Sequence, residues 1–236
     1  MVETSRKASP RQVARTLAKS AYGAVEGVRF VREVVKPNVR RWWWERELAA
    51  LNDTLAATPL AGRYWVWSGL LLGWARHGRP IKHDPDADFA VRREHLPELE
   101  AAFCELLRAG YLPYRRCYDN SGRLTEVCVL TPESRPAEFF VMDPLEGGEL
   151  AFFVYGETDQ GWVQCEGRLP DQQLVPFKFV NRAWMKPEDH ERELALVYGD
   201  NWRTPDPGWS YMSDDKSIVG RRPWRPESVA RSGFLV

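Results

Sequence analysis

The segment Trp67–Val91 has the sequence WSGLLLGWARHGRPIKHDPDADFAV, and its hydrophobic spacing changes from helical to alternating along its length. The preceding run RYWVW predicts a strand, SGLLLGWARHG a helix and DADFAV a second strand. Side chains two apart on a strand project to the same face, so Asp86 and Asp88 point together. Asp84 joins them only if the strand extends back past Pro85, which favours a start near Asp86. The chain is therefore restricted to folds in which one strand face carries acidic side chains close to a helix.

The remaining periodicity predicts a mixed α+β fold. A first helix is expected from Ser9 to Pro37 and a second from Asn38 to Pro59. The further predicted elements are a helix over 96–110, a hairpin of RLTEVCVL and AEFFVM, a strand LVPFKFV, and a helix from Pro187 to Gly199. These elements form a small mixed sheet with flanking helices, preceded by the N-terminal helices. The predicted domains are a basic helical segment over 1–58, an α+β domain over 59–207 and an irregular tail over 208–236.

The charge of this net-neutral chain is unevenly distributed. Residues 1–46 hold 11 Lys and Arg against 4 Asp and Glu, a formal charge of +7, so the rest carries −7. An anionic membrane surface and an ordinary solvated helix face explain the basic segment equally well. There is no RNA-binding aromatic motif, so no nucleic-acid partner is expected.

Cysteine usage and hydropathy bear on the cellular location. The four cysteines show no C-x-x-C spacing, no apolar signal-peptide core follows a basic start, and no apolar run is long enough to span a membrane. We therefore expect reduced thiols and a cytoplasmic protein, which the basic segment would allow to lie peripherally at the inner membrane surface.

The acidic strand and the Ser68-Gly69 turn together suggest a phosphate and metal site. Two carboxylates on one half-buried face destabilise each other unless a cation or a raised pKa relieves them, and Mg²⁺ or Mn²⁺ prefers such oxygen ligands. A turn containing glycine at a helix start can bind a phosphate through backbone N–H groups. The cationic residues available between the two elements are Arg76, His77, Arg79 and Lys82. Asp-Pro-Asp alone is common in surface turns and Ser-Gly alone is often a helix cap, so the prediction depends on the joint arrangement.

These residues resemble the signature of the LicD family, G-[GT]-x-L-L-G-x-x-R-H followed by I-P-W-D-D-D-x-D. Ser68-Gly69 match the small-residue turn, Leu71-Leu72-Gly73 the L-L-G, Arg76-His77 the R-H, and Ile81 the isoleucine. Asp84, Asp86 and Asp88 match three of the four acids, whereas Lys82, His83 and Pro85 depart from the pattern. The run PEDHERELALVYGDNWRTPDP also resembles the family's closing helix ending in Y-G-D. The resemblance covers Tyr64 to Pro207.

The resemblance implies a nucleotidyltransferase-like catalytic domain that binds Mg²⁺ through Asp86, Asp88 and a carboxylate from a neighbouring strand. Glu138 and Asp143 are the candidates for that carboxylate; since they lie five apart, only one should reach the metal. We favour Glu138, either as metal ligand or as proton acceptor, and assign Asp143 to substrate binding or to the turn before Pro144.

The implied reaction transfers a substituted phosphate, phosphocholine or a polyol phosphate, from a CDP-type donor to a hydroxyl of a glycan or glycolipid. Ser68, Gly69, His77 and Lys82 would bind the substrate, and Arg76 would neutralise developing charge. Transfer of the nucleotide instead, or a non-catalytic membrane- or partner-binding protein of the same fold, are the alternatives.

Overall fold

The computed structural model describes residues 36–82, 84–224 and 229–230. By internal contacts the chain divides into two units, Met1–Trp44 and Glu45–Val236. The first predicted helix, from Ser9 to Pro37, lies almost wholly outside the described residues, and so does most of the basic segment over 1–46. Helix α2 (Lys36–Ala56) follows as predicted from the second periodic run, and its Leu48, Leu51 and Leu55 are fully buried.

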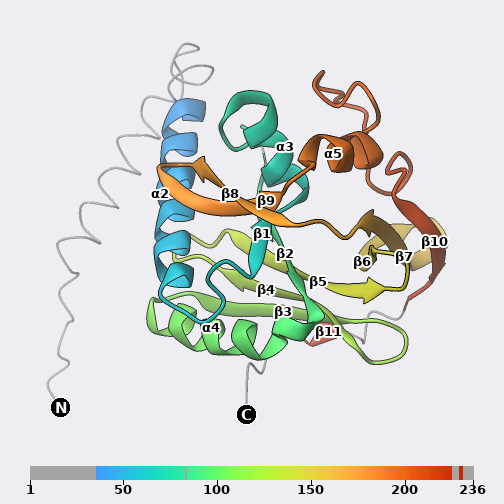
Figure 1. Ribbon diagram of the computed structural model, residues 1–236, viewed down its shortest axis with the longest axis horizontal. Helices are drawn as coiled ribbons and strands as arrows, with labels where there is room; N and C mark the ends of the chain where they lie inside the picture. Colours follow the sequence, from blue (N-terminus) through green and yellow to red (C-terminus); the bar gives the residue numbers. More distant parts are fainter. Residues whose placement is uncertain (1–35, 83, 225–228, 231–236) are drawn as a thin grey trace, which may run out of the picture. The chain divides into compact units, whose positions relative to one another are not determined.

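A nine-stranded sheet forms the framework of the second unit (Figure 1). Its strands are β1 (Tyr64–Val66), β2 (Ala87–Arg92), β3 (Leu112–Tyr118), β4 (Leu124–Leu130), β5 (Pro136–Leu145), β6 (Glu149–Thr158), β7 (Gly161–Pro170), β10 (Ile218–Pro223) and β11 (Val229–Ala230). The order is β10-β7-β6-β5-β4-β3-β11, with β2 pairing both β1 and β5. Strand β5 therefore joins two parts of the sheet: its first half lies between β2 and β4, and its last residues pair with β6.

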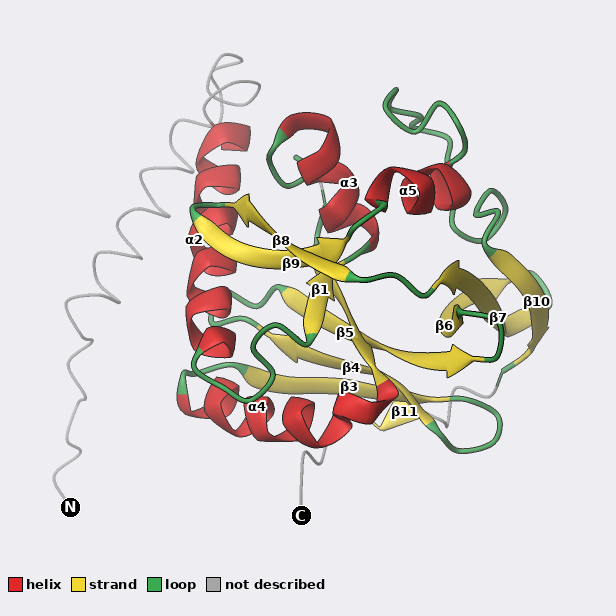
Figure 2. Cartoon of the chain, in the orientation of Figure 1, coloured by secondary structure: helices red, strands yellow, loops and turns green. Residues whose placement is uncertain are grey.

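Short helices and a separate hairpin complete this unit (Figure 2). The helices are α3 (Ser68–His77), α4 (Leu96–Arg108) after the 3₁₀ turn η2 (Arg93–His95), and α5 (His190–Tyr198), and the hairpin pairs β8 (Leu174–Phe179) with β9 (Arg182–Pro187). In Figure 1, α3 and α5 are drawn above the sheet and α4 below it. The α+β fold with a mixed sheet and flanking helices is confirmed, and the nine-stranded sheet is larger than the small one predicted.

The two faces of β2 and β5 differ in chemistry because neighbouring residues alternate between them. On one face, Phe89 of β2 and Phe139 of β5 stack with ring centroids 5.2 Å apart, and Phe103 of α4 packs edge-on against Phe139 at 5.6 Å. All three rings are almost completely buried. Each such side chain contributes about 1.5–3 kcal/mol through burial, so this apolar layer holds the opposite, acidic face in place.

The structure departs from the predicted elements in the C-terminal third. Residues Ile218–Pro223, expected to be irregular, form β10 against β7, because an edge strand needs few apolar side chains and tolerates proline. The last helix begins at His190 and not at Pro187, which ends β9; Asp189 caps it by accepting from the Arg192 N–H. The long hairpin of β6 and β7 was not predicted.

The state of the cysteines and the hydropathy of the helices were both predicted from the sequence. All four cysteines, Cys104, Cys117, Cys128 and Cys165, are unbonded. None of the helices in the described ranges is long and apolar enough to cross a membrane.

Candidate active site

A row of functional side chains crosses four adjacent strands. Asp88 of β2 lies beside Glu138 of β5, Glu138 lies beside Cys128 of β4, and Cys128 lies beside Arg115 of β3. Paired residues in a ladder project to the same face, with strands about 4.8 Å apart. The sheet register therefore gathers these groups on the face opposite the Phe89–Phe139 stack.

Three carboxylates of this face converge. Asp86, which directly precedes β2, joins Asp88 and Glu138, and their nearest carboxylate oxygens all lie within 4.8 Å of one another. Three carboxylates without histidine or thiolate are a donor set for a hard divalent cation such as Mg²⁺ or Mn²⁺. The residues present thus fit a metal ion, and they are the three that the sequence selected.

The electrostatics of Asp88 and Glu138 also favour a bound cation. Burial, followed by the charges of Glu138, Asp86 and Asp84, raises the pKa of Asp88 well above its ordinary value, and a hydrogen bond from Ser68 opposes this only in part. Burial, followed by the charge of Glu126, raises the pKa of Glu138 to about 8. A positive charge bound beside Asp88 and Glu138 would favour their ionised forms.

Arg115 is the cation in the site that sequence analysis missed. Its guanidinium donates to Glu126 Oε1 at 2.7 Å and to Glu138 Oε1 at 2.8 Å, and the charges of both glutamates raise the pKa of Arg115. The alternation of LPYRRCY indicates which face Arg115 shares with Cys117, but no local signal shows that β3 lies two strands from Glu138. Its position depends on the long-range pairing of β3, β4 and β5.

The carboxylates open into a cavity of about 610 Å³. That volume lies within the usual range for small-molecule sites. Among the described residues, the cavity wall carries seven carboxyl groups (Asp86, Asp88, Glu126, Glu138, Glu157, Glu193 and Asp215) and one guanidinium, that of Arg115. Aromatic side chains form much of the remaining wall, and Tyr155 and Trp224 have ring centroids 4.0 Å apart. The cavity is strongly acidic, so a phosphorylated ligand requires added cations to enter it.

Ser68 of the predicted Ser68-Gly69 turn lines this cavity, whereas Gly69 is not among its lining residues. Ser68 has the left-handed φ of +47°, which costs about 1–3 kcal/mol in a residue other than glycine and is typical of functional sites. Its hydroxyl contacts Tyr198 Oη at 3.3 Å and hydrogen-bonds Asp88. A Cβ on Gly69 would lie 2.7 Å from Asp84 Oδ2, so glycine is needed there for the close approach of that carboxylate. Burial, followed by the charge of Asp86, raises the pKa of Asp84 to about 8.

The predicted cationic residues of this segment lie elsewhere. Arg76 donates from Nε to the Trp202 carbonyl at 2.6 Å and from Nη2 to the Thr204 carbonyl at 3.2 Å. His77 and Lys82 are exposed. Arg76, His77 and Lys82 are not among the residues that line the cavity. Arg76 is therefore placed to hold the segment after α5.

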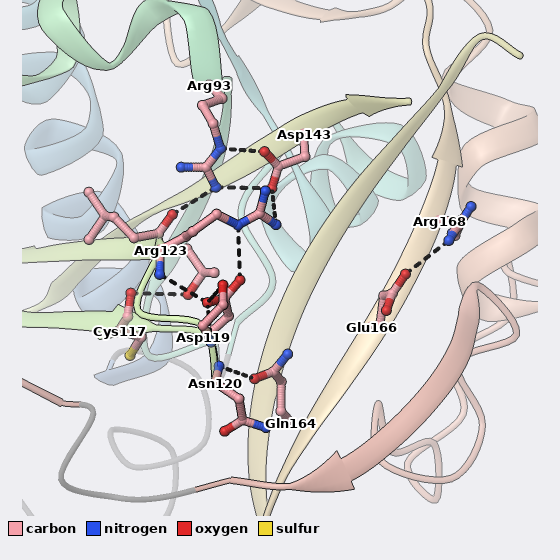
Figure 3. A network of polar contacts seen from close by, with 12 residues as sticks. Arg93, Cys117, Asp119, Asn120, Arg123, Asp143, Gln164, Glu166 and Arg168 are labelled. Atoms are coloured by element: carbon pink, nitrogen blue, oxygen red, sulfur yellow. Dashed lines mark hydrogen bonds and ion pairs between the residues drawn. The ribbon is translucent and has the colours of Figure 1, made fainter. Parts of the chain in front are cut away.

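Asp143 belongs to a different cluster, at the far end of β5 (Figure 3). Its carboxylate accepts from Arg93, including the 2.9 Å bond from Nη2 to Oδ2, and from Arg123 Nη2 at 3.4 Å. Arg123 is also held by Asp119 in the turn between β3 and β4. Two arginines contact Asp143, which does not line the cavity, so Glu138 is the acid of β5 that lies with Asp86 and Asp88.

The fold and the carboxylate site are those of a nucleotidyltransferase-type domain, and comparisons with known proteins agree with this class. Residues 62–126 match the family described as LicD/FKTN/FKRP, nucleotidyltransferase domain, in agreement with the resemblance seen in the sequence. This match contains α3, the Asp86–Asp88 pair and both Arg115 and Glu126.

Two curated relatives cover more of the chain. Human ribitol 5-phosphate transferase FKRP is 28% identical over 188 residues, which are 71% of this chain and 35% of the relative. The mouse protein of the same name is 28% identical over 176 residues, 67% of this chain and 33% of the relative. The chain thus spans about a third of the length of these relatives. Among solved structures, the lincosamide antibiotic adenylyltransferase LnuA, bound to lincomycin, aligns with a TM-score of 0.42 and 13% identity, over 67% of this chain and 92% of that chain.

Proposed function

We propose that this protein is a metal-dependent LicD-like transferase that passes a substituted phosphate, phosphocholine or a polyol phosphate, from a CDP-type donor to a hydroxyl of a glycan or glycolipid. The observation that carries the proposal is the convergence of Asp86, Asp88 and Glu138 beside Ser68 in one cavity. The family match and the two relatives, both named as ribitol 5-phosphate transferases, support a transferase of phosphate groups.

Each residue of the site has a distinct part in this reaction. Asp86, Asp88 and Glu138 would hold Mg²⁺ or Mn²⁺, which neutralises the donor phosphates and the charge on the leaving group. Arg115 orients Glu138 through the 2.8 Å bond and keeps Glu126 paired. The Ser68 hydroxyl, fixed between Asp88 and Tyr198, orients the Asp88 carboxylate. The aromatic wall around Tyr155 and Trp224 offers flat surfaces for the pyrimidine of the donor.

A ligand and product assay tests the proposal. Purified protein is mixed with CDP-choline, CDP-ribitol, CDP-glycerol, ATP or CTP, each with and without Mg²⁺ and Mn²⁺, and thermal unfolding and products are measured. We expect a CDP-type donor to raise the melting temperature only with metal, and CMP to be released. Transfer of the nucleotidyl group onto an acceptor would support the nucleotidyltransferase alternative. Absence of any metal response would support the non-catalytic alternative.

We also propose that the protein acts in the cytoplasm, with its basic segment at the anionic inner surface of a membrane. The charge of +7 over residues 1–46 supports this location, because cationic segments are attracted to anionic headgroups. A glycolipid acceptor would then be within reach of the site. No nucleic-acid partner is proposed.

A further inference from the structure

One carboxyl group of the cavity wall, on α5, has no role assigned so far. Glu193 is 3% exposed, and its side chain has no hydrogen-bond or ion-pair partner among the described residues. On the same helix, Glu191 is exposed and pairs with Arg203. Glu193 thus differs from its neighbour in both burial and pairing.

The burial of Glu193 is not that of a core residue, because it faces the cavity. Glu193, Leu194, Val197 and Tyr198 all line it, as the three-to-four-residue spacing of one helix face requires. A buried carboxyl group without a partner is unfavourable compared with an apolar side chain of similar size. Burial alone raises the pKa of Glu193 to about 8. A ligand group in the cavity would supply the missing partner.

The position of α5 places Glu193 near the carboxylate site. Tyr198, five residues further along the helix, contacts Ser68 at 3.3 Å, and Ser68 hydrogen-bonds Asp88. Five residues correspond to roughly 7.5 Å along a helix axis. A ligand of small-molecule size that reaches Asp88 can therefore also reach Glu193 within the same cavity.

The other carboxyl groups close to the proposed metal position already have a role or a partner. Asp86, Asp88 and Glu138 form the metal donor set, and Glu126 is bound to Arg115. Glu193 has neither an arginine nor another carboxylate in contact, so above its raised pKa of about 8 it is ionised and one of its oxygens is available to accept a proton.

We propose that Glu193 is a catalytic residue, the base that accepts the proton of the attacking hydroxyl. The inference rests on the proposed function. In the step, the acceptor O–H bond breaks and its proton moves to a Glu193 oxygen, while the hydroxyl oxygen forms a bond to the donor phosphorus. The bond from phosphorus to the leaving nucleotide oxygen breaks at the same time, and CMP carries away that electron pair. No further reactant is needed.

Glu193→Gln tests this assignment, with Glu191→Gln as the matched control on the exposed side of the same helix. Ethanol and the more acidic trifluoroethanol serve as acceptors, with CDP-ribitol, CDP-choline and CDP-glycerol as donors in the presence of Mg²⁺. We expect Glu193→Gln to lower kcat by about 10²–10⁴-fold with ethanol, as for loss of a general base. The loss should be smaller with trifluoroethanol, which gives up its proton more readily. The Mg²⁺-induced shift in melting temperature should be retained.

The measured rates distinguish a wrong assignment of Glu193 from a wrong proposed function. If the wild type turns over a donor and Glu193→Gln keeps at least a third of that rate, the assignment of Glu193 is wrong while the proposed function stands. An equal loss with both alcohols would also overturn it, because a purely structural role does not depend on acceptor acidity. If the wild type turns over no donor, the proposed function fails and this assignment fails with it. Glu191→Gln should match the wild type within about twofold, as expected for a surface change.

Discussion

Replacing Asp88 with asparagine tests the carboxylate site directly, because it removes one charge and keeps the shape of the side chain. Asp88, like each member of the group, takes part in two of the three repulsions among Asp86, Asp88 and Glu138. Asparagine can still accept the hydrogen bond from Ser68 through its amide oxygen. We therefore expect Asp88→Asn to fold, and to be more stable than the wild type when no metal is bound.

The size of this gain follows from the geometry. At the 4.8 Å limit of the oxygen separations and an effective dielectric constant of about 20, two unit charges repel by about 3.5 kcal/mol. The wild type avoids part of this repulsion by binding protons, as the raised pKa values of Asp88 and Glu138 show. We therefore expect a gain of about 2–3 kcal/mol at pH 8.5, which corresponds to roughly 5–10 °C in melting temperature for a domain of this size.

The gain should depend on pH in a defined direction. A carboxyl group whose pKa is raised on folding stabilises the protein below its unfolded pKa of about 4, and this stability is lost as the pH rises through the folded value. For Glu138 the folded pKa is about 8, so the metal-free wild type loses stability between about pH 4 and pH 8. The difference between Asp88→Asn and the wild type should be smallest at pH 5 and largest at pH 8.5.

Thermal and urea unfolding at pH 5, 7 and 8.5, with EDTA or with Mg²⁺, measure these effects. Mg²⁺ at 100 times its dissociation constant should stabilise the wild type by about 2.7 kcal/mol and leave Asp88→Asn unchanged. Asp84→Asn is the control: Asp84 lies outside the three converging carboxylates, so this variant should keep its Mg²⁺ response. If Asp88→Asn is no more stable than the wild type at pH 8.5, or keeps the full Mg²⁺ shift, the metal-site interpretation is wrong.

Three further changes test other parts of the structure. Gly69→Ala should destabilise the protein by about 1–3 kcal/mol through overpacking, and Asp84→Ser should recover much of that loss in the double variant, as urea unfolding would measure. Arg76→Lys should lower the free energy of unfolding by about 1–2 kcal/mol, because lysine cannot reproduce both carbonyl contacts, and turnover per folded molecule should not change. A large fall in kcat would instead indicate that Arg76 binds a phosphate of the substrate. Residues 1–46 should bind anionic vesicles in flotation assays, with weaker binding as salt rises, and equal binding to neutral vesicles would contradict the electrostatic basis.

The carboxylate site was accessible from sequence because its information is mostly local. The two-residue spacing of Asp86 and Asp88 determines a shared face, and the odd separation of Glu138 and Asp143 requires that only one of them share it. Arg115 and Glu193 were not accessible in this way. Arg115 reaches the site only through the register of β3, β4 and β5, and Glu193 only through the packing of α5 over the cavity, and neither arrangement has a local sequence signal.

The two segments that resemble the LicD signature lie far apart along the chain but contact each other in the structure. Ser68, at the start of α3, meets Tyr198 across 130 residues, and Arg76, near its end, binds the carbonyl of Trp202 across 126 residues. The closing segment therefore holds α3 at both ends. Because the first of these contacts fixes the hydroxyl that hydrogen-bonds Asp88, the Y-G-D helix can influence the carboxylate site without lining the metal position itself. The distant Y-G-D segment therefore positions α3, the helix that ends in Arg76-His77, and this is a physical reason for both to occur in the same fold.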